Sequence, residues 1–177
     1  IRMESTIGSI SGLEPMEEGG LLTAANASQI CDGASAVMIA NGETCKRLGL
    51  KPMAKFVALS VVGSDPVIML EGPIPATEKV LERAGMKIGD IDLFEVNEAF
   101  GSVPLAWAKA TGADLSKLNV NGGAQALGHP LGGTGAKLMT TLLYELQRSK
   151  KRFGLLAICE GGGTANGTIV ERVDSVD

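Results

Sequence analysis

The sequence places an asparagine, a histidine and a cysteine beside glycines or at the ends of apolar runs. Asn97 follows the run IDLFEV (91–96), and Cys159 closes another apolar run and precedes three glycines. His129, the only histidine, lies between Gly128 and Pro130. An imidazole can act as a general base or hydrogen-bond donor, and a thiol beside glycine N–H groups can be reactive. Because functional sites of α/β proteins gather where strands end, the pattern favours one shared site.

Each of these residues also has a purely structural interpretation. Asn97 is a good helix N-cap, His129 can be a turn residue, and Cys159 can be a small buried hydrophobe. The other cysteines, Cys31 and Cys45, lack the glycine setting, so we interpret them as a loop residue and a helix packing residue. The residue types alone leave both interpretations of the three-residue set open.

Several other chemistries fit the sequence poorly. A structural zinc site needs about four Cys or His ligands with a CxxC-like step; the chain has four such residues in total and no such step, so we expect no metal. No GxSxG elbow appears, and the segment GHPLGGTG (128–135) is neither GxGxxG nor a Walker A loop, because Thr134 stands where the lysine is needed. Three cysteines cannot all pair, which favours a reducing, cytoplasmic compartment.

Composition narrows the class of protein further. The chain has 177 residues, 45% of them hydrophobic, enough for one domain with an arm. The net charge of -4 argues against nucleic acid as a partner. No apolar run reaches the ~20 residues that cross a bilayer, and no N-terminal signal pattern is present, so we expect no membrane association.

Strand and helix periods alternate along the chain and predict an α/β layered domain. The predicted strands cover 34–40, 54–62, 91–96, 119–121 (brief), 153–159 and 168–173. The predicted helices cover 43–48, 77–84, 98–111 and 135–148, with a proline-containing loop at 65–75. The last two strands predict an antiparallel pair at one edge of a mixed sheet. The helix at 98–111 lacks a polar face, so we expect it to lie between the sheet and a further domain.

Five motifs in order resemble the C-terminal half of thiolases, the acetyl-CoA acyltransferase family, over about residues 20–173. The motifs are NASQICDGASAV (26–37), EGPIPA (71–76), NEAF (97–100), NGGAQALGHPLGGTGAK (121–137) and CEGGG (159–163). The resemblance implies a thiolase-like fold, a five-stranded mixed sheet with helices on both faces. It also implies that 1–30 is the end of a loop domain or arm and 31–177 the C-terminal domain.

The resemblance further implies a ping-pong transfer of acyl groups between coenzyme A thioesters, in 3-ketoacyl-CoA thiolysis or acetyl-CoA condensation, within fatty acid metabolism. It implies acyl-CoA substrates, no separate cofactor, an N-terminal thiolase half that carries the nucleophilic cysteine, and a homo-oligomeric full-length enzyme.

Roles transfer motif by motif to this sequence. His129 resembles the residue that activates the nucleophile and helps bind the thioester oxygen, and Cys159 the acid/base cysteine. Asn97 resembles the holder of an oxyanion-site water, and the N–H of Gly161 part of a second oxyanion hole. In the substrate-binding region, Ser28 resembles the lining of the pantetheine tunnel and Met69 a contact near the acyl group.

The sequence departs from the family pattern at two places. Leu70-Glu71 follows Met69, and Glu160 follows Cys159, where small or apolar residues are usual; an inward-pointing Glu160 would raise the pKa of the thiol. No cysteine matches the nucleophile motif, so we expect this chain to be inactive by itself. A non-catalytic acyl-CoA or lipid-binding module with this fold is the alternative, and a ketoacyl synthase is disfavoured by the single histidine.

Overall fold

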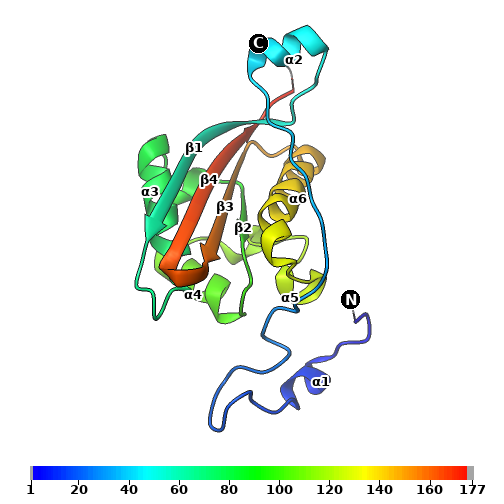
Figure 1. Ribbon diagram of the computed structural model, residues 1–177, viewed down its shortest axis with the longest axis vertical. Coiled ribbons are helices and arrows are strands. Elements are labelled where there is room, and N and C mark those ends of the chain that lie inside the picture. The colour runs from blue at the N-terminus through cyan, green and yellow to red at the C-terminus, as the bar shows by residue number, and fades with distance from the viewer. Residues whose placement is uncertain (1, 175–177) are drawn as a thin grey trace.

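The computed structural model describes residues 2–174, which form a mixed four-stranded sheet with helices on both faces (Figure 1). The strands are ordered β1 (Ala54–Gly63), β4 (Thr164–Arg172), β3 (Phe153–Glu160) and β2 (Leu93–Val96). Strand β4 is antiparallel to β1 and β3, and β2 is parallel to β3. The α/β class and the antiparallel β3–β4 pair are confirmed. The placement of that pair at an edge is wrong, because β1 and β2 form the two edges.

Two hydrophobic cores lie on opposite faces of the sheet. Helices α3 (Pro73–Ala84) and α4 (Ser102–Thr111) cover one face, and α6 (Thr134–Ser149) covers the other (Figure 1). Side chains of β3 point alternately to the two faces of the sheet and so contribute to both cores. Leu155 packs in the core with α3 and α4, and Leu156 packs in the core with α6.

The predicted helices at 43–48, 77–84 and 135–148 are confirmed as α2 (Gly42–Leu48), α3 and α6, with shifted ends. Gly49 and Gly85 end α2 and α3 in the left-handed conformation. Helix α3 starts earlier than predicted, at Pro73, because a proline in the first turn has no N–H that the helix would leave unpaired. The loop predicted at 65–75 therefore ends at Gly72.

The helix predicted at 98–111 starts only at Ser102, as α4. Trp107 is buried on the sheet side, where its ring packs edge-on against Phe94 at 5.2 Å and its Nε1 donates to Thr77 at 2.8 Å. Leu105 on another side of α4 is 61% exposed, so within the described residues the helix is buried on one side only.

The expected fifth strand is not formed among the described residues. Segment 119–121 forms no strand; only its neighbour Leu118 pairs with β2, in a single parallel bridge to Phe94. Asn119 has a φ of +47°, which takes the backbone out of the extended region and ends the pairing.

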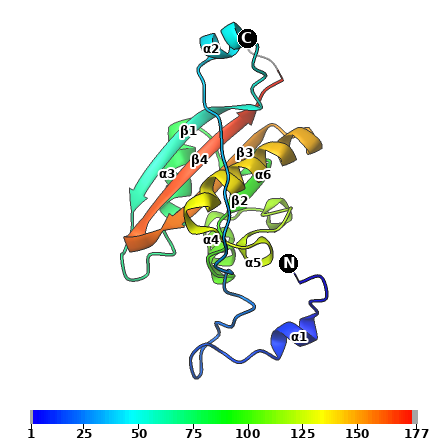
Figure 2. The same ribbon diagram turned by 45° about the vertical axis from the view of Figure 1, so that its right-hand side comes forward.

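The strand predicted at 34–40 is also wrong. These residues run as an extended segment with no neighbouring strand and pass over α6 (Figure 2). Val37 packs against the α6 core, whereas Met38 and Ile39 are 82% and 71% exposed. The apolar pattern predicts a buried strand, but a strand needs a partner that pairs with its backbone groups, and none lies beside this segment within the described residues.

The arm before this segment extends away from the sheet and carries the short helix α1 (Ile7–Ser11) (Figure 1). The remaining short helices are η1 (Ile88–Asp90), η2 (Leu115–Lys117), α5 (Ala124–Leu127), η3 (Leu131–Gly133) and η4 (Gly161–Gly163). No helix within residues 2–174 is long and apolar enough to span a bilayer.

Candidate active site

Asn97 lies at the centre of the candidate site, immediately after β2. Its backbone N–H donates to the carbonyl of Ala157 at 3.1 Å, which fixes it beside the end of β3. Its side-chain Nδ2 is 3.5 Å from Nε2 of His129, and its amide lies close enough to the Cys159 thiol to lower the pKa of that thiol. The structure thus brings Asn97, His129 and Cys159 together. Asn97 is 1% exposed, and its Oδ1 has no hydrogen-bond partner among the described residues.

His129 is held by a hydrogen bond to Thr134, at the start of α6. Nδ1 of His129 is 2.6 Å from Oγ1 of Thr134, whose own hydroxyl donates to the carbonyl of Pro130 at 3.2 Å. With its hydrogen used in this way, the Thr134 oxygen accepts from Nδ1–H, which leaves Nε2 as the unprotonated nitrogen. The free lone pair therefore faces Asn97 and the site.

The electrostatic surroundings keep His129 neutral. Burial lowers the pKa of the imidazole, and the nearby ammonium of Lys137 lowers it further. Lys137 lies in the first part of α6 and donates to the carbonyl of Gly128 at 3.2 Å. A neutral imidazole with a free Nε2 can accept a proton from a thiol and then donate it to an oxygen.

Cys159 has the opposite character, because its surroundings favour the protonated thiol. Burial raises its pKa, while hydrogen bonds from the backbone and from the Asn97 side chain oppose the rise. Glu160 makes the smallest contribution, also upward. The Glu160 carboxylate is exposed and accepts from Asn166 at 2.6 Å and from Thr164 at 3.2 Å. The site thus combines a neutral base with a protonated thiol.

Gly161 begins the tight turn η4 that joins β3 to β4 directly after Cys159 and Glu160. Its own Cβ position is open, with no atom within 4 Å. Gly163 has a φ of +83°, and a Cβ there would meet the carbonyl oxygen of Ser64 at 2.7 Å. Ser64 N–H in turn donates to the Gly163 carbonyl at 2.6 Å, so the turn is locked against the loop after β1.

Ser28 and Met69 lie on segments that border this cluster. Backbone N–H of Ser28 donates to the carbonyl of Ala99 at 3.0 Å, so the arm runs beside the loop after Asn97. One residue further, the carbonyl of Gln29 accepts from His129 N–H at 2.8 Å. Met69, with a φ of +32°, lies in the loop that packs on the η4 turn. The arm therefore ties the Asn97 loop to the His129 loop.

Two buried polar residues next to the site are not predicted as functional from the sequence. Thr134 is 1% exposed and orients His129; its signal was a hydroxyl five residues after the only histidine. Glu95 is 1% exposed and shares a strand face with Asn97, two residues away. Burial, then the charge of Glu98, raise the pKa of Glu95 to about 8, against a lowering by Lys137.

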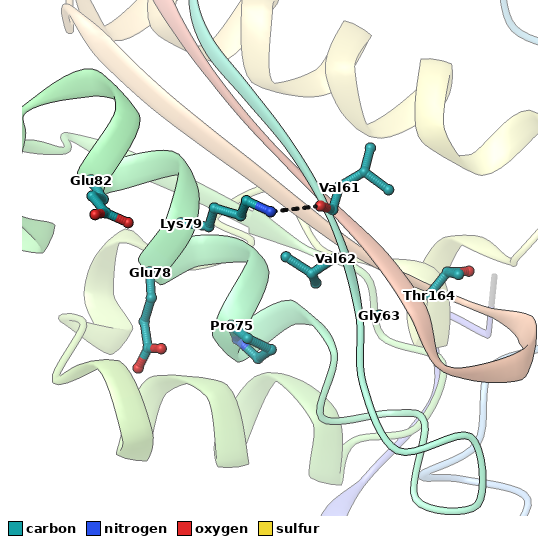
Figure 3. A pocket seen from close by; sticks show the side chains of 8 residues that line it. All are labelled: Val61, Val62, Gly63, Pro75, Glu78, Lys79, Glu82 and Thr164. Carbon is teal, nitrogen blue, oxygen red and sulfur yellow. Dashed lines mark hydrogen bonds between the residues drawn. The ribbon is translucent and has the colours of Figure 1, made fainter.

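A surface depression lies elsewhere, between β1 and α3 (Figure 3). It measures about 640 Å³ and is lined by Glu78 and Glu82 of α3, with Lys79 donating to the carbonyl of Val61 at 3.4 Å. The two carboxylates make it unsuitable for an anionic ligand. Within residues 2–174, no group of three His, Cys, Asp or Glu side chains is arranged to hold a metal ion.

Comparison with known proteins defines the class of this site. Residues 50–172 match the family model described as "Thiolase, C-terminal domain". The chain is 56% identical to the steroid 3-ketoacyl-CoA thiolase FadA6 of Mycobacterium tuberculosis over 96% of its own length and 42% of the relative's. It is 47% identical to an acetyl-CoA acetyltransferase of Allochromatium vinosum, over 97% and 44% of the two chains.

Solved structures agree with these sequence relatives. Human mitochondrial 3-ketoacyl-CoA thiolase superposes with a TM-score of 0.95 at 42% identity, over 97% of this chain and 44% of that one. The same human enzyme is also known in complex with CoA. The chain belongs to the thiolase family and corresponds to its C-terminal domain. It spans less than half the length of the relatives it matches.

Proposed function

We propose that this chain forms the C-terminal catalytic half of a thiolase that transfers acyl groups between coenzyme A thioesters. The observation that carries the proposal is the position of Asn97, whose side-chain Nδ2 is 3.5 Å from the His129 imidazole and whose amide lies close enough to the Cys159 thiol to lower its pKa. The named activities of the relatives, 3-ketoacyl-CoA thiolase and acetyl-CoA acetyltransferase, support the same reaction class.

An N-terminal half supplies the nucleophilic cysteine in this proposal. Its support is the coverage of the relatives, of which this chain matches only 42–44%. The exposed apolar side chains of the extended segment 34–40, such as Met38 and Ile39, also suit a surface that another part of the enzyme covers. We propose that the assembled enzyme is a homo-oligomer and that this chain by itself is inactive.

In thiolysis, His129 Nε2 takes the proton of the nucleophilic thiol, which attacks the 3-keto carbon of the substrate. The imidazolium keeps this proton and donates a hydrogen bond to the oxyanion that forms at C3, and the Asn97 side chain helps to hold the donors in place. The bond between C2 and C3 breaks, and Cys159 delivers its proton to C2 of the departing enolate. The protonated thiol favoured by burial suits this step.

The second half-reaction restores both groups. The thiol of coenzyme A attacks the acyl-enzyme and gives its proton to the Cys159 thiolate. The imidazolium of His129 returns its proton to the leaving nucleophile thiolate. The N–H of Gly161 stabilises oxygen charge on the enolate side, and Ser28 and Met69 border the path of the pantetheine and acyl groups.

The test uses the assembled enzyme, in which this chain is joined to its N-terminal half, and follows acetoacetyl-CoA thiolysis. H129A and C159S are each expected to lower kcat/KM by about 10²–10⁴-fold, the usual contribution of an acid or base. The matched control is C45S, a cysteine buried in α2, which should stay near the wild-type rate. Near-normal rates for H129A or C159S would refute the assigned roles, and robust turnover by this chain alone would refute the need for the N-terminal half.

A further inference from the structure

The place of the absent fifth strand beside β2 is taken by one side chain, that of Asn119. After the bridge between Leu118 and Phe94, the Asn119 backbone N–H donates to the Phe94 carbonyl at 2.9 Å. Further along the edge, Oδ1 of Asn119 accepts from the Val96 N–H at 2.8 Å, and Nδ2 donates to the Val96 carbonyl at 2.9 Å. The side-chain amide thus pairs with the last residue of β2 as a neighbouring strand would.

Glu98 extends this contact to the next loop. Its Oε1 accepts from the same Asn119 Nδ2 at 2.9 Å, and its Oε2 accepts from the backbone N–H of Gln125 at 3.1 Å. The carboxylate fills the space that a side chain at position 123 would occupy, because a Cβ on Gly123 would lie 2.3 Å from the Glu98 carboxyl carbon. Both oxygens of Glu98 are therefore used, each by a donor from a different part of the 119–128 segment.

These contacts enclose Asn97 on both sides along the chain. Asn119 holds the residue before it, Val96, and Glu98 is the residue after it. The segment that Glu98 holds then leads through α5 and Gly128 to His129. One carboxylate and one amide therefore connect the backbone on either side of Asn97 to the loop that carries the imidazole.

We propose that Glu98 and Asn119 are positioning residues that set the separation of Asn97 and His129 for acyl transfer. The inference rests on the proposed function and adds two residues to it that touch no reacting atom. A displacement of about 1 Å in such a site can cost about 10²-fold in rate, so loss of either contact is expected to act on kcat.

The variant E98Q tests this with almost no change in shape. A glutamine has one acceptor oxygen, so one of the two donors, Asn119 Nδ2 or Gln125 N–H, then faces an NH2 group. In the assembled enzyme we expect E98Q to lower kcat for acetoacetyl-CoA thiolysis by about 10-fold or more, with KM nearly unchanged. The matched control is E78Q, an isosteric change on α3 beside the depression in Figure 3, which should leave kcat unchanged.

A double-mutant cycle separates positioning from a general loss of stability. If Glu98 acts through Asn97, E98Q should lower kcat little further in an N97A background, because the positioned group is already absent. Full additivity of the two losses, or a normal kcat for a folded E98Q enzyme, would overturn the inference.

The variant N119D provides a second measurement if E98Q folds poorly. It keeps the acceptor for Val96 N–H but replaces the donor to Val96 and Glu98, so it should show the same fall in kcat. A normal kcat for N119D would also overturn the inference. If wild type turns over and N97A is impaired while E98Q is normal, only the positioning role fails; if the wild-type assembled enzyme is inactive, the proposed function fails.

Discussion

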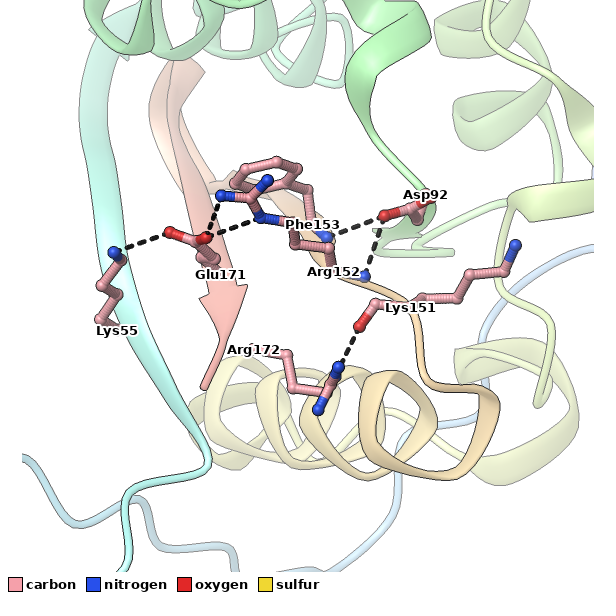
Figure 4. A network of polar contacts seen from close by, with 7 residues as sticks. All are labelled: Lys55, Asp92, Lys151, Arg152, Phe153, Glu171 and Arg172. Carbon is pink, nitrogen blue, oxygen red and sulfur yellow. Dashed lines mark hydrogen bonds and ion pairs between the residues drawn. The ribbon is translucent and has the colours of Figure 1, made fainter. Parts of the chain in front are cut away.

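Polar side chains at the two ends of the sheet differ in burial and in hydrogen-bond partners. At the site end, Glu95 and Asn97 are 1% exposed, and each has one side-chain oxygen without a hydrogen-bond partner among the described residues. At the other end, Glu171 lies between two cations, Lys55 at 2.8 Å and Arg152 at 2.7 Å (Figure 4). The pKa of Glu171 is lowered by these partners, whereas the pKa of Glu95 is raised to about 8.

The opposite end also pairs the backbone groups at the start of β3 with a carboxylate. Asp92 accepts from the N–H groups of both Arg152 and Phe153, at 3.0 and 2.9 Å, where β3 begins (Figure 4). The Arg152 guanidinium stacks over the Phe153 ring at 4.7 Å. One end of the same sheet is thus arranged for stability. The site end contains buried polar groups that lower the stability of the fold, and such groups occur where chemistry needs perturbed pKa values.

Among variants that test this comparison of the two ends, the largest effect is expected from loss of the hydrogen bond between Thr134 and His129, which should lower the rate. T134V keeps the shape but removes the acceptor for Nδ1–H, so the imidazole loses its fixed tautomer and orientation. We expect kcat/KM of the assembled enzyme to fall by about 10–100-fold and the pH profile of the rate to shift. T134S keeps the hydroxyl and serves as control; equal losses in T134S and T134V would show that packing, and not the hydrogen bond, is what matters.

The next effect is on stability and concerns Glu95. Its pKa is about 8 in the fold against an ordinary value of 4.5, so the folded state binds more protons between these two pH values. Stability therefore falls as pH rises from about 4.5 to 8, and the penalty is complete above pH 8.

E95Q removes this titration. The variant should gain stability over wild type progressively up to pH 8, reaching about 5 kcal/mol, because the pKa differs by about 3.5 and each pKa unit is worth about 1.4 kcal/mol. Urea unfolding of both proteins from pH 5 to 8.5 measures the difference. A difference that does not change with pH would show that Glu95 is not protonated in the fold.

The smallest effect is expected at the opposite end. The hydrogen bond from Lys55, followed by that from Arg152, lowers the pKa of Glu171. The ionised Glu171 carboxylate therefore stabilises the fold above its unfolded pKa, and this stabilisation is lost as pH falls through its lowered folded pKa. E171Q should cost about 0.5–1 kcal/mol at pH 7, as partly exposed ion pairs do, and progressively less in acid. The same urea series checks it: E95Q and E171Q must differ in the sign of their effect at pH 8, and a shared sign would contradict the comparison.

Much of the fold follows from local sequence signals. A continuous apolar run identifies β3, a period-3.6 pattern identifies α6, and Gly49 and Gly85 mark helix ends. The positions of Asn97 and Cys159 at strand ends also follow, because β2 and β3 are parallel neighbours whose carboxyl ends meet.

The remaining features depend on contacts between distant residues. The strand-like pairing by the Asn119 side chain depends on a positive φ and on atoms of Val96, neither of which a hydrophobic pattern encodes. The segment 34–40 has the composition of a strand but no partner within the described residues. The buried acid Glu95 lies in an apolar run. Its neighbours in the sequence indicate a position in the core, and only its own carboxyl group indicates that it lies beside the site.

The central claim is that His129 and Cys159 perform different steps in one site, and one measurement tests it most directly. In the exchange of labelled coenzyme A with acetyl-CoA no enolate forms, so His129 can pass the thiol proton between the nucleophile and coenzyme A without Cys159, whereas thiolysis also needs a proton at C2. In the assembled C159S enzyme, exchange should stay within about 10-fold of wild type while thiolysis falls by about 10³-fold. Equal losses of exchange and thiolysis, or no loss of either, would contradict the account.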